Sequence, residues 1–309
     1  MSPAEPGGRP ENLAPTRCSV AAAGRADPIR GTAPPARRWL LLEHPGPWRV
    51  DAVAGSGVEP SVLAALTDAA ARTATRVLLI RRPGRSSAPS HRRWLLAGPG
   101  VGTVMGLWAA DRELGAAVDA LESSSPPSES RAEPLLLVCA HGVHDACCAI
   151  QGRPVAAALD QRWPGQVWEC SHVGGDRFAP NVVVLPDGFF YGGLDPAAAV
   201  GSVAAHLAGQ VRTAHLRGMA RYPPAQQAAV VAALERYGPL GPDAVTVAAA
   251  RHEGRYGEPG SRTLVELRVA GLDRTVHAEV AAVRRPPARL TCRAVRETPA
   301  TEYRIEHLD

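Results

Sequence analysis

The sequence predicts an α/β protein, and three observations support this fold class. Apolar runs of strand length, such as residues 135–138 and 182–185, alternate with amphipathic stretches of helical spacing. The 309 residues are 45% hydrophobic and 21% charged, which is typical of a globular chain with a sizeable core. The middle of the chain also follows the order strand, helix, strand, strand, helix. We therefore expect one large domain or two ordinary ones.

The first part of the chain divides into a lead-in and an α/β region. Residues 1–36 are rich in Pro, Gly, Ala and Arg without apolar periodicity, which predicts a mobile segment. Residues 37–122 are expected to form the α/β region. Its predicted strands are 39–43, 76–80 and 94–97, and its predicted helices are 60–71 and 114–121. The glycine-rich stretch 98–106 is interpreted as a tight turn, and the serine–proline stretch 123–128 as a linker.

A second α/β unit is predicted over residues 130–215. Its expected elements are a strand at 135–138, a helix from about Cys148 to Leu159, strands at 167–171, 182–185 and 189–191, and a helix from Asp195-Pro196 to Leu207. The turn Asp187-Gly188 joins the last two strands. The order β-α-β-β-α is the core order of a thioredoxin-like fold, so we expect a thioredoxin-like domain here.

The C-terminal region, residues 222–309, is predicted to be a smaller α+β tail. A helix is expected at 226–237, followed by strands at 263–269, 275–283 and 290–294. No internal repeat is visible in the sequence.

Composition excludes several classes of function. All 34 basic residues are arginines, but they are scattered and the net charge is only +4, so nucleic-acid binding is not expected. No stretch reaches the roughly 18 apolar residues of a membrane span. The N-terminus is polar where a signal peptide needs an apolar core, which predicts a cytoplasmic protein. Six cysteines in a reducing compartment favour a metal or redox role over disulfides.

Two short stretches concentrate the metal-binding side chains. Cys139–Cys148 follows a predicted strand, and Glu169–Asp176 follows the next one. Together they contain four of the six cysteines and three of the ten histidines. Gly174-Gly175 allows a close approach of the backbone. Two such loops can enclose a [2Fe–2S] cluster or a tetrahedral metal ion.

The spacing Cys139-x8-Cys148, followed by His172-x-Gly-Gly-x5-Asn181, resembles the sucrase/ferredoxin-like family, itself similar to the thioredoxin-like [2Fe–2S] ferredoxins. The resemblance is good over residues 135–207 and weaker over the leading region. It implies a [2Fe–2S] cofactor, with Cys139 and Cys148 on one iron and His172 as the first of two histidines on the other. It also implies a non-enzymatic electron carrier whose partners are redox proteins.

The ligand expected after His172 is replaced in this chain. Asp176 stands where the family has its second histidine, and a carboxylate is a harder donor than imidazole. Cys170 is a softer donor two residues before His172. Three arrangements stay open: His172 with Asp176, His172 with Cys170, or no stable cluster. Mixed Cys/His ligation would raise the reduction potential above that of an all-cysteine ferredoxin.

Two other functions compete with electron transfer. A thiol–disulfide oxidoreductase could use Cys147 or Cys148 at a helix start, where the helix dipole favours a thiolate. A zinc-binding or cluster-less thioredoxin-like module is the other alternative, supported mainly by Asp176.

Ordinary structural roles are considered for the remaining cysteines and histidines and for Asn181. We interpret Cys147 as a core residue, and Cys18 and Cys292 as cysteines without donor neighbours. His141 and His144 are either hydrogen-bonded near the thiols or solvated. The amide of Asn181 either fixes the Gly-Gly loop or belongs to an ordinary turn.

Overall fold

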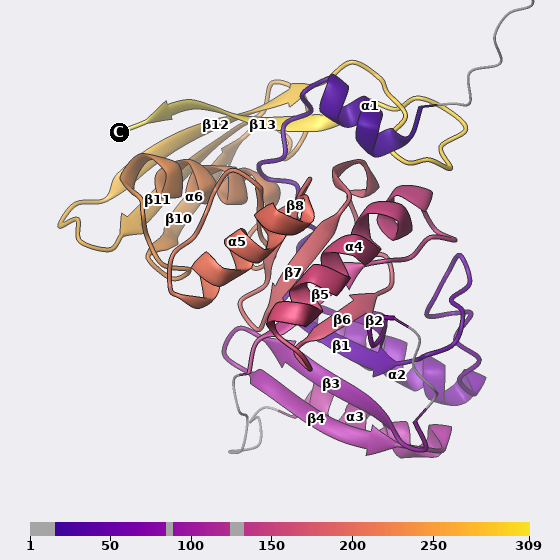
Figure 1. Cartoon of the computed structure of the whole chain (residues 1–309). Helices are drawn as coiled ribbons and strands as arrows, with labels where there is room; N and C mark the ends of the chain where they lie inside the picture. Colours follow the sequence, from indigo (N-terminus) through magenta and orange to yellow (C-terminus); the bar gives the residue numbers. More distant parts are fainter. Residues whose placement is uncertain (1–15, 85–88, 124–132) are drawn as a thin grey trace, which may run out of the picture.

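Three ranges of the chain are described by the computed structural model: residues 16–84, 89–123 and 133–309. They form a nine-stranded sheet and a separate four-stranded sheet, with six α-helices packed around them (Figure 1). The strand order of the large sheet is β4-β3-β1-β2-β6-β5-β7-β8-β9. No helix within these ranges is both long and apolar enough to cross a membrane. The predicted α/β class is confirmed.

The large sheet contains two units with the same topology. The elements of the first are β1 (Arg38–Glu43), α2 (Pro60–Arg72), β2 (Thr75–Arg81), β3 (Arg92–Gly98), β4 (Gly102–Trp108), the 3₁₀ turn η1 (Asp111–Leu114) and α3 (Gly115–Glu122). Those of the second are β5 (Leu135–Cys139), α4 (Ala146–Arg162), β6 (Val167–Cys170), the 3₁₀ turn η2 (Asp176–Phe178), β7 (Asn181–Leu185), β8 (Phe189–Gly192) and α5 (Pro196–Leu207).

Pairing in the two units is equivalent. In each, the first strand runs parallel to the second and antiparallel to the third, and the third is antiparallel to the fourth. The units meet where β2 pairs antiparallel with β6, through Ile80↔Cys170 and Arg81↔Glu169. Because the sequence shows no repeat, this duplication is one of topology.

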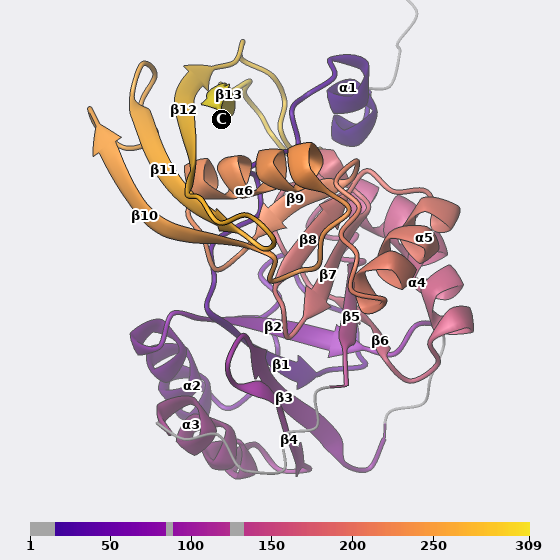
Figure 2. The same cartoon turned by 90° about the vertical axis from the view of Figure 1, so that its left-hand side faces the viewer.

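Strand alternation divides the first unit between two cores. Leu40 and Leu42 pack under α2 and α3, whereas Trp39 and Leu41 face the second unit. The Trp39 ring lies 6.4 Å from that of Phe190 on β8. The helix-free faces of the two units thus share one buried cluster, while the helices cover their outer faces (Figure 2). That shared cluster includes Cys139, Cys148 and Cys170.

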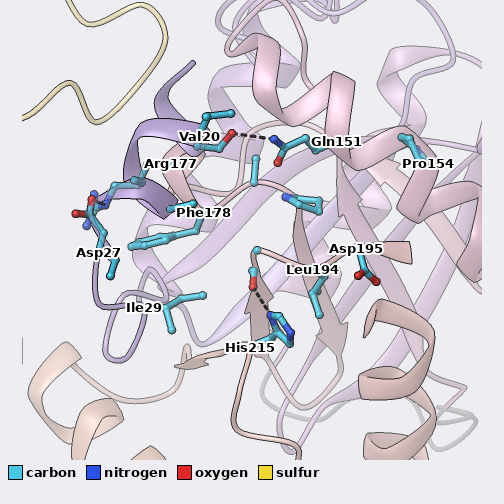
Figure 3. Close-up of a pocket in the computed structure, with 18 of the residues that line it drawn as sticks. Val20, Asp27, Ile29, Gln151, Pro154, Arg177, Phe178, Leu194, Asp195 and His215 are labelled. Carbon is cyan, nitrogen blue, oxygen red and sulfur yellow. Dashed lines mark hydrogen bonds and ion pairs between the residues drawn. The ribbon is translucent and has the colours of Figure 1, made fainter. Parts of the chain in front are cut away.

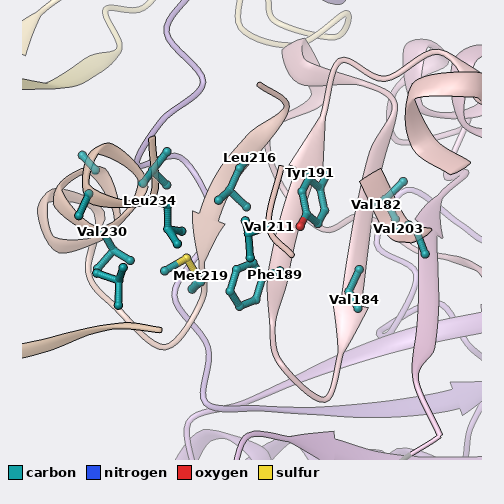
Figure 4. Packing of buried hydrophobic residues seen from close by; sticks show 14 of the residues in the cluster. Val182, Val184, Phe189, Tyr191, Val203, Val211, Leu216, Met219, Val230 and Leu234 are labelled. Atoms are coloured by element: carbon teal, nitrogen blue, oxygen red, sulfur yellow. The ribbon is translucent and has the colours of Figure 1, made fainter. Parts of the chain in front are cut away.

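The C-terminal region packs on the second unit through one helix. After β9 (Leu216–Met219), helix α6 (Pro224–Tyr237) covers the end of the large sheet, and the small sheet covers α6. The strands of the small sheet are β10 (Val245–Glu253), β11 (Arg262–Val269), β12 (Val276–Arg284) and β13 (Thr301–Leu308). Val230 and Leu234 of α6 meet Met219 and Phe189 in a continuous core (Figure 4).

Several strands differ from the predictions. The expected strand at 290–294 is wrong, because this segment is a turn and the last strand is β13. β4, β9 and β10 were not predicted. β4 is an edge strand whose Met105 and Leu107 are 58% and 57% exposed, so it lacks the usual in–out pattern. Of the glycine-rich stretch 98–106, only residues 99–101 form the predicted tight turn, which joins β3 to β4, whereas 102–106 belong to β4.

Part of the predicted lead-in is packed onto the protein. Residues 1–15 lie outside the described ranges, but Cys18–Gly24 forms helix α1. Its Cys18 is only 2% exposed. In Figure 1, α1 lies beside the loop that precedes β13.

Candidate metal centre

The two predicted ligand loops meet at one edge of the sheet. Cys139 ends β5 and Cys170 ends β6, and these parallel strands pair Cys139 with Cys170. Since the carboxyl ends of parallel strands lie at the same edge, the loops that follow them come together. Helix α4 approaches closely because Gly152 faces the Cys139 carbonyl, where a Cβ would lie 2.2 Å from that oxygen. The packing brings Cys148 to Cys139.

The buried thiols form the deep half of the site. Cys139 and Cys148 are each 1% exposed, and their thiols lie close enough to shift each other's pKa. The hydrogen bond from Cys148 lowers the pKa of Cys139, and backbone N–H groups of His141 and Val173 act in the same direction. The pKa of Cys148 is raised by that same hydrogen bond and by burial. Cys139 is therefore the thiol that is best prepared to become a thiolate.

Asp176 connects the thiols to the imidazoles. Its Oδ1 lies 3.4 Å from Cys148 Sγ and 2.9 Å from His172 Nδ1. The ring N–H of His172 is not aligned for a linear hydrogen bond, so the second contact is an ion pair. Burial alone raises the pKa of Asp176, but His172 and Cys148 outweigh it and the pKa is lowered. Burial lowers the pKa of His172, but Asp176 outweighs that effect and the pKa is raised.

His144 joins this group from the other loop. Its ring stacks on that of His172 at 3.8 Å, and its Nε2 lies 3.8 Å from Asp176 Oδ2. The donor atoms of His144, His172 and Asp176 lie within 4.8 Å of one another. Both imidazoles keep 30% of their side-chain surface exposed, whereas Asp176 keeps 2%. The histidines thus form the outer half of the site.

Backbone carbonyls of the first unit fix the tautomers of His141 and His144. His141 Nε2 lies 2.8 Å from the Arg49 carbonyl, and His144 Nδ1 lies 3.2 Å from the Val50 carbonyl. A carbonyl only accepts, so these nitrogens carry the protons. His141 Nδ1 is then free to accept from the His172 backbone N–H, at 3.3 Å. The lone pair of His144 Nε2 is likewise free, as in a metal-ligating histidine held by its other nitrogen.

Two arginines, the buried Arg217 and the half-buried Arg76, hold the Gly-Gly loop. Arg217, 1% exposed, donates to the Gly174 carbonyl at 2.8 Å and to Asn181 Oδ1 at 2.7 Å. The Asn181 amide donates to the Gly175 carbonyl at 3.0 Å, so its predicted role in fixing the loop is confirmed. From the opposite side, Arg76 donates to the carbonyls of His172 and Val173 at 3.2 and 3.0 Å. The loop is positioned by side chains from three segments.

Gly175→Ala should destabilise the protein strongly. Gly175 has φ +80°, and a Cβ there would lie 2.3 Å from Arg217 Nη2, which is itself locked by hydrogen bonds. We expect a loss of about 2–4 kcal/mol, from backbone strain plus distortion of a buried hydrogen-bond network. Urea unfolding measures it. Gly165→Ala is the matched control, since Gly165 has φ +83° with nothing within 4 Å; an equal loss in both variants would contradict the role of Arg217.

A separate pocket lies behind the site. It has a volume of about 660 Å³ and lies between α1 and the start of α5. Arg177 and Phe178 of η2 border it, together with Leu194 and His215, while Asp176 at the start of η2 belongs to the metal centre (Figure 3). None of the predicted ligands lines this pocket. The predicted ligands therefore lie apart from this pocket.

The structure brings together four of the five predicted site residues. Cys148, His172 and Asp176 are in direct contact, and Cys139 contacts Cys148. Cys170 lies beside Cys139 in the sheet, fully buried, and burial raises its pKa. No group of three or more close donors among the described residues includes Cys139, Cys148 or Cys170.

Two expectations about other residues require correction. His144, expected to be hydrogen-bonded near the thiols or solvated, lies instead against His172 and Asp176. Cys18 and Cys292 were expected to lack donor neighbours, and this is wrong: both contact Cys147. Residues separated by more than a hundred positions cannot be paired from spacing alone.

The fold and the site together define a mixed α/β protein with a thiol–imidazole–carboxylate centre at the end of two parallel strands. The family model for sucrase/ferredoxin-like proteins matches residues 29–218, more than half of the chain, so this chain belongs to that family. Comparisons with curated proteins and with solved structures found no match.

Proposed function

We propose that this protein binds a [2Fe–2S] cluster and carries electrons, with Cys139 and Cys148 on one iron and His172 with Asp176 on the other. The observation that carries the proposal is the position of Asp176, which contacts the thiol side through Cys148 and the imidazole side through His172. Thiols and imidazoles are the ligands of mixed iron–sulfur sites. Candidate donors for both irons therefore converge from two loops.

The residues present fit such a group. The buried Nδ1 of His172 has no aligned hydrogen-bond partner among the described residues. A bound group, or rotation of the imidazole ring, would give this nitrogen a partner. Cys139 receives backbone N–H groups, which stabilise a thiolate ligand. Six free cysteines, with no disulfide among them, agree with the reducing cytoplasmic setting that we propose.

The second unit supports a thioredoxin-like assignment. The order β6-β5-β7-β8, with β5 and β6 parallel and the other pairs antiparallel, is the arrangement expected for a β-α-β-β-α core. The first unit has the same arrangement but offers no thiol. We propose that the second unit carries the cofactor and that the first shields it.

When bound, a [2Fe–2S] cluster supplies reversible one-electron transfer. Near that position lie the guanidinium groups of the half-buried Arg76 and the buried Arg217, whose positive charge favours the more negative reduced state. His172 reaches solvent and can exchange a proton there, whereas both thiols are shielded from water. Electron transfer should therefore be coupled to proton uptake at the imidazole edge.

Redox proteins are the proposed partners, docking at this edge. The exposed apolar side chains of Val50 and Val143, 42% and 56% exposed, lie on the two segments that the His144–Val50 hydrogen bond joins. Exposed apolar side chains beside a functional group are typical of protein-binding surfaces. They would bring a partner close to the half of the site that reaches solvent.

A mononuclear metal site is the second candidate. His144, His172 and Asp176 alone present three donor atoms within 4.8 Å, which would suit a catalytic or structural zinc ion. In that case, Cys139 and Cys148 would be a buried thiol pair without metal. A thiol–disulfide oxidoreductase is less well supported, because Cys147 and Cys148 are 0% and 1% exposed.

Anaerobic purification separates these functions. We expect a coloured protein with about two irons and two labile sulfides per chain, and an electron paramagnetic resonance signal after reduction. The signal should be that of a mixed-ligand cluster with nitrogen coupling from His172. A colourless protein after reconstitution with iron and sulfide would overturn the proposal, and zinc lost on His144→Ala would favour the mononuclear site.

A further inference from the structure

Three cysteines and one aspartate lie close together at the N-terminal end of helix α4. Cys18 comes from α1, Asp145 and Cys147 from the beginning of α4, and Cys292 from the loop before β13. Their donor atoms all lie within 4.8 Å of one another. Figure 1 shows α1 and that loop side by side above α4. This cluster, which we call the three-thiol site, is separate from the centre described above.

The sulfur geometry suits one tetrahedral ion. Cys18 and Cys147 are 3.7 Å apart, Cys147 and Cys292 3.3 Å, and Cys292 and Cys18 3.5 Å, measured between Sγ atoms. A tetrahedral zinc with Zn–S bonds of about 2.3 Å separates its sulfurs by about 3.8 Å. Ligands on different irons of a cluster would lie farther apart. A single ion lying out of the plane of the three sulfurs, toward a fourth donor, requires only small movements.

Asp145 supplies the fourth donor. Its Oδ2 lies 3.5 Å from Cys18 Sγ, about the oxygen–sulfur distance across a tetrahedral zinc ion. The carboxylate is 1% exposed, yet no arginine or histidine of the described ranges is in ion-pair contact with it. Backbone N–H groups of Cys147 and Cys292 donate to its two oxygens at 2.9 and 2.6 Å. A buried carboxylate without a cationic partner is costly, and a bound cation would remove that cost.

We propose that Cys18, Cys147, Cys292 and Asp145 form a structural site for zinc or a similar thiophilic divalent cation. Binding converts three thiols to thiolates and releases three protons to solvent, without any redox change. The occupied site would carry a net charge of about −2, the sum of the ion, three thiolates and the carboxylate. Arg25 and Arg177 lie close enough to Cys18 to interact with that charge.

An ion at the three-thiol site would link three segments that are distant in the sequence. Cys18 and Cys292 are 274 positions apart, and the ion would fasten both to the first turn of α4. Cys147 and its neighbour Cys148 then serve different centres: Cys147 faces the three-thiol site and Cys148 contacts Asp176. Since both residues belong to one helical turn, an ion at the three-thiol site would also steady the position of Cys148.

Metal content of the full-length protein tests the site. Produced with zinc and a reductant, the wild type should hold about one zinc per chain, in addition to any iron. Co²⁺ in its place should give the charge-transfer and ligand-field bands of a tetrahedral thiolate site, and X-ray absorption should find three sulfurs and one oxygen. Cys18→Ser and Cys292→Ser should each lose most of the zinc. Cys170→Ser, which removes another buried thiol, should keep it.

The readouts separate this site from the iron centre. Cys139→Ser should lose iron and keep zinc, so failure of the cluster proposal leaves this test intact. The proposal is overturned if the wild type binds neither zinc nor Co²⁺, if a disulfide joins two of the three cysteines in the reduced preparation, or if zinc is retained in Cys292→Ser but lost in Cys139→Ser. The wild-type spectra decide the matter even where a variant does not fold.

Discussion

Cys148→Ser is expected to lose the iron–sulfur cluster and keep zinc, whereas Cys147→Ser should keep the cluster and lose zinc. The two thiols are adjacent in sequence but point about 100° apart around the helix axis. Cys148 contacts Cys139 and Asp176, while Cys147 lies 3.3 Å from Cys292. Serine keeps the size and removes the thiolate. Each variant should therefore empty one site.

Iron, labile sulfide and zinc are measured on the same anaerobic preparations. We expect iron to fall from about two per chain to a small residue in Cys148→Ser, and zinc to fall similarly in Cys147→Ser. Each variant is the matched control for the other, because both remove one fully buried thiol from the same turn. Loss of both metals in both variants would contradict the assignment of the two cysteines to separate centres.

Asp176→His is expected to keep the cluster and raise its reduction potential. The substitution replaces an anionic ligand by a neutral one, so the reduced state carries less negative charge. A rise on the order of 100 mV is expected, judged from the gap between histidine-containing and all-cysteine clusters. The potential should also become more dependent on pH, because a second imidazole can take up a proton on reduction. Protein-film voltammetry from pH 6 to about 9 measures both effects.

Alanine variants identify the fourth ligand. If Asp176 binds iron, Asp176→Ala should lose most of the cluster and His144→Ala should keep it. If the free Nε2 of His144 is the ligand instead, the pattern should reverse. His141→Ala is the control, since its Nε2 is already committed to the Arg49 carbonyl. A potential that does not change in Asp176→His would show that residue 176 does not ligate iron.

The first unit contacts the candidate site without contributing a donor atom to it. The segment after β1 crosses to the second unit, where the carbonyls of Arg49 and Val50 set the protonated nitrogens of His141 and His144. The Trp48 ring packs edge-on against His141 at 5.7 Å. The equivalent segment after β5 carries the thiols. The second unit thus carries the candidate donors, and the first unit orients two of its histidines.

Much of the secondary structure followed from local pattern. Buried strands such as β5 and β7 are continuous apolar runs, and Asp195-Pro196 begins α5 with the Asp195 carboxylate accepting from Ala198 N–H at 2.7 Å. The prediction failed where the pattern is weak. β13 is rich in charged residues and only partly buried, so its pairing with β12 rests on tertiary contacts instead of hydrophobic alternation.

The sequence by itself determined the α/β class, the two loops rich in cysteine and histidine, and the family, because each depends on residues that are close together in the chain. It also indicated the unusual Asp176. Only the tertiary structure decided which donors meet. The pairing of β5 with β6 brings Asp176 between Cys148 and His172. The Val50 carbonyl of the first unit orients His144. The packing of segments near both chain ends places Cys18 and Cys292 against Cys147. Contacts across such separations depend on three-dimensional packing, which spacing along the chain does not encode.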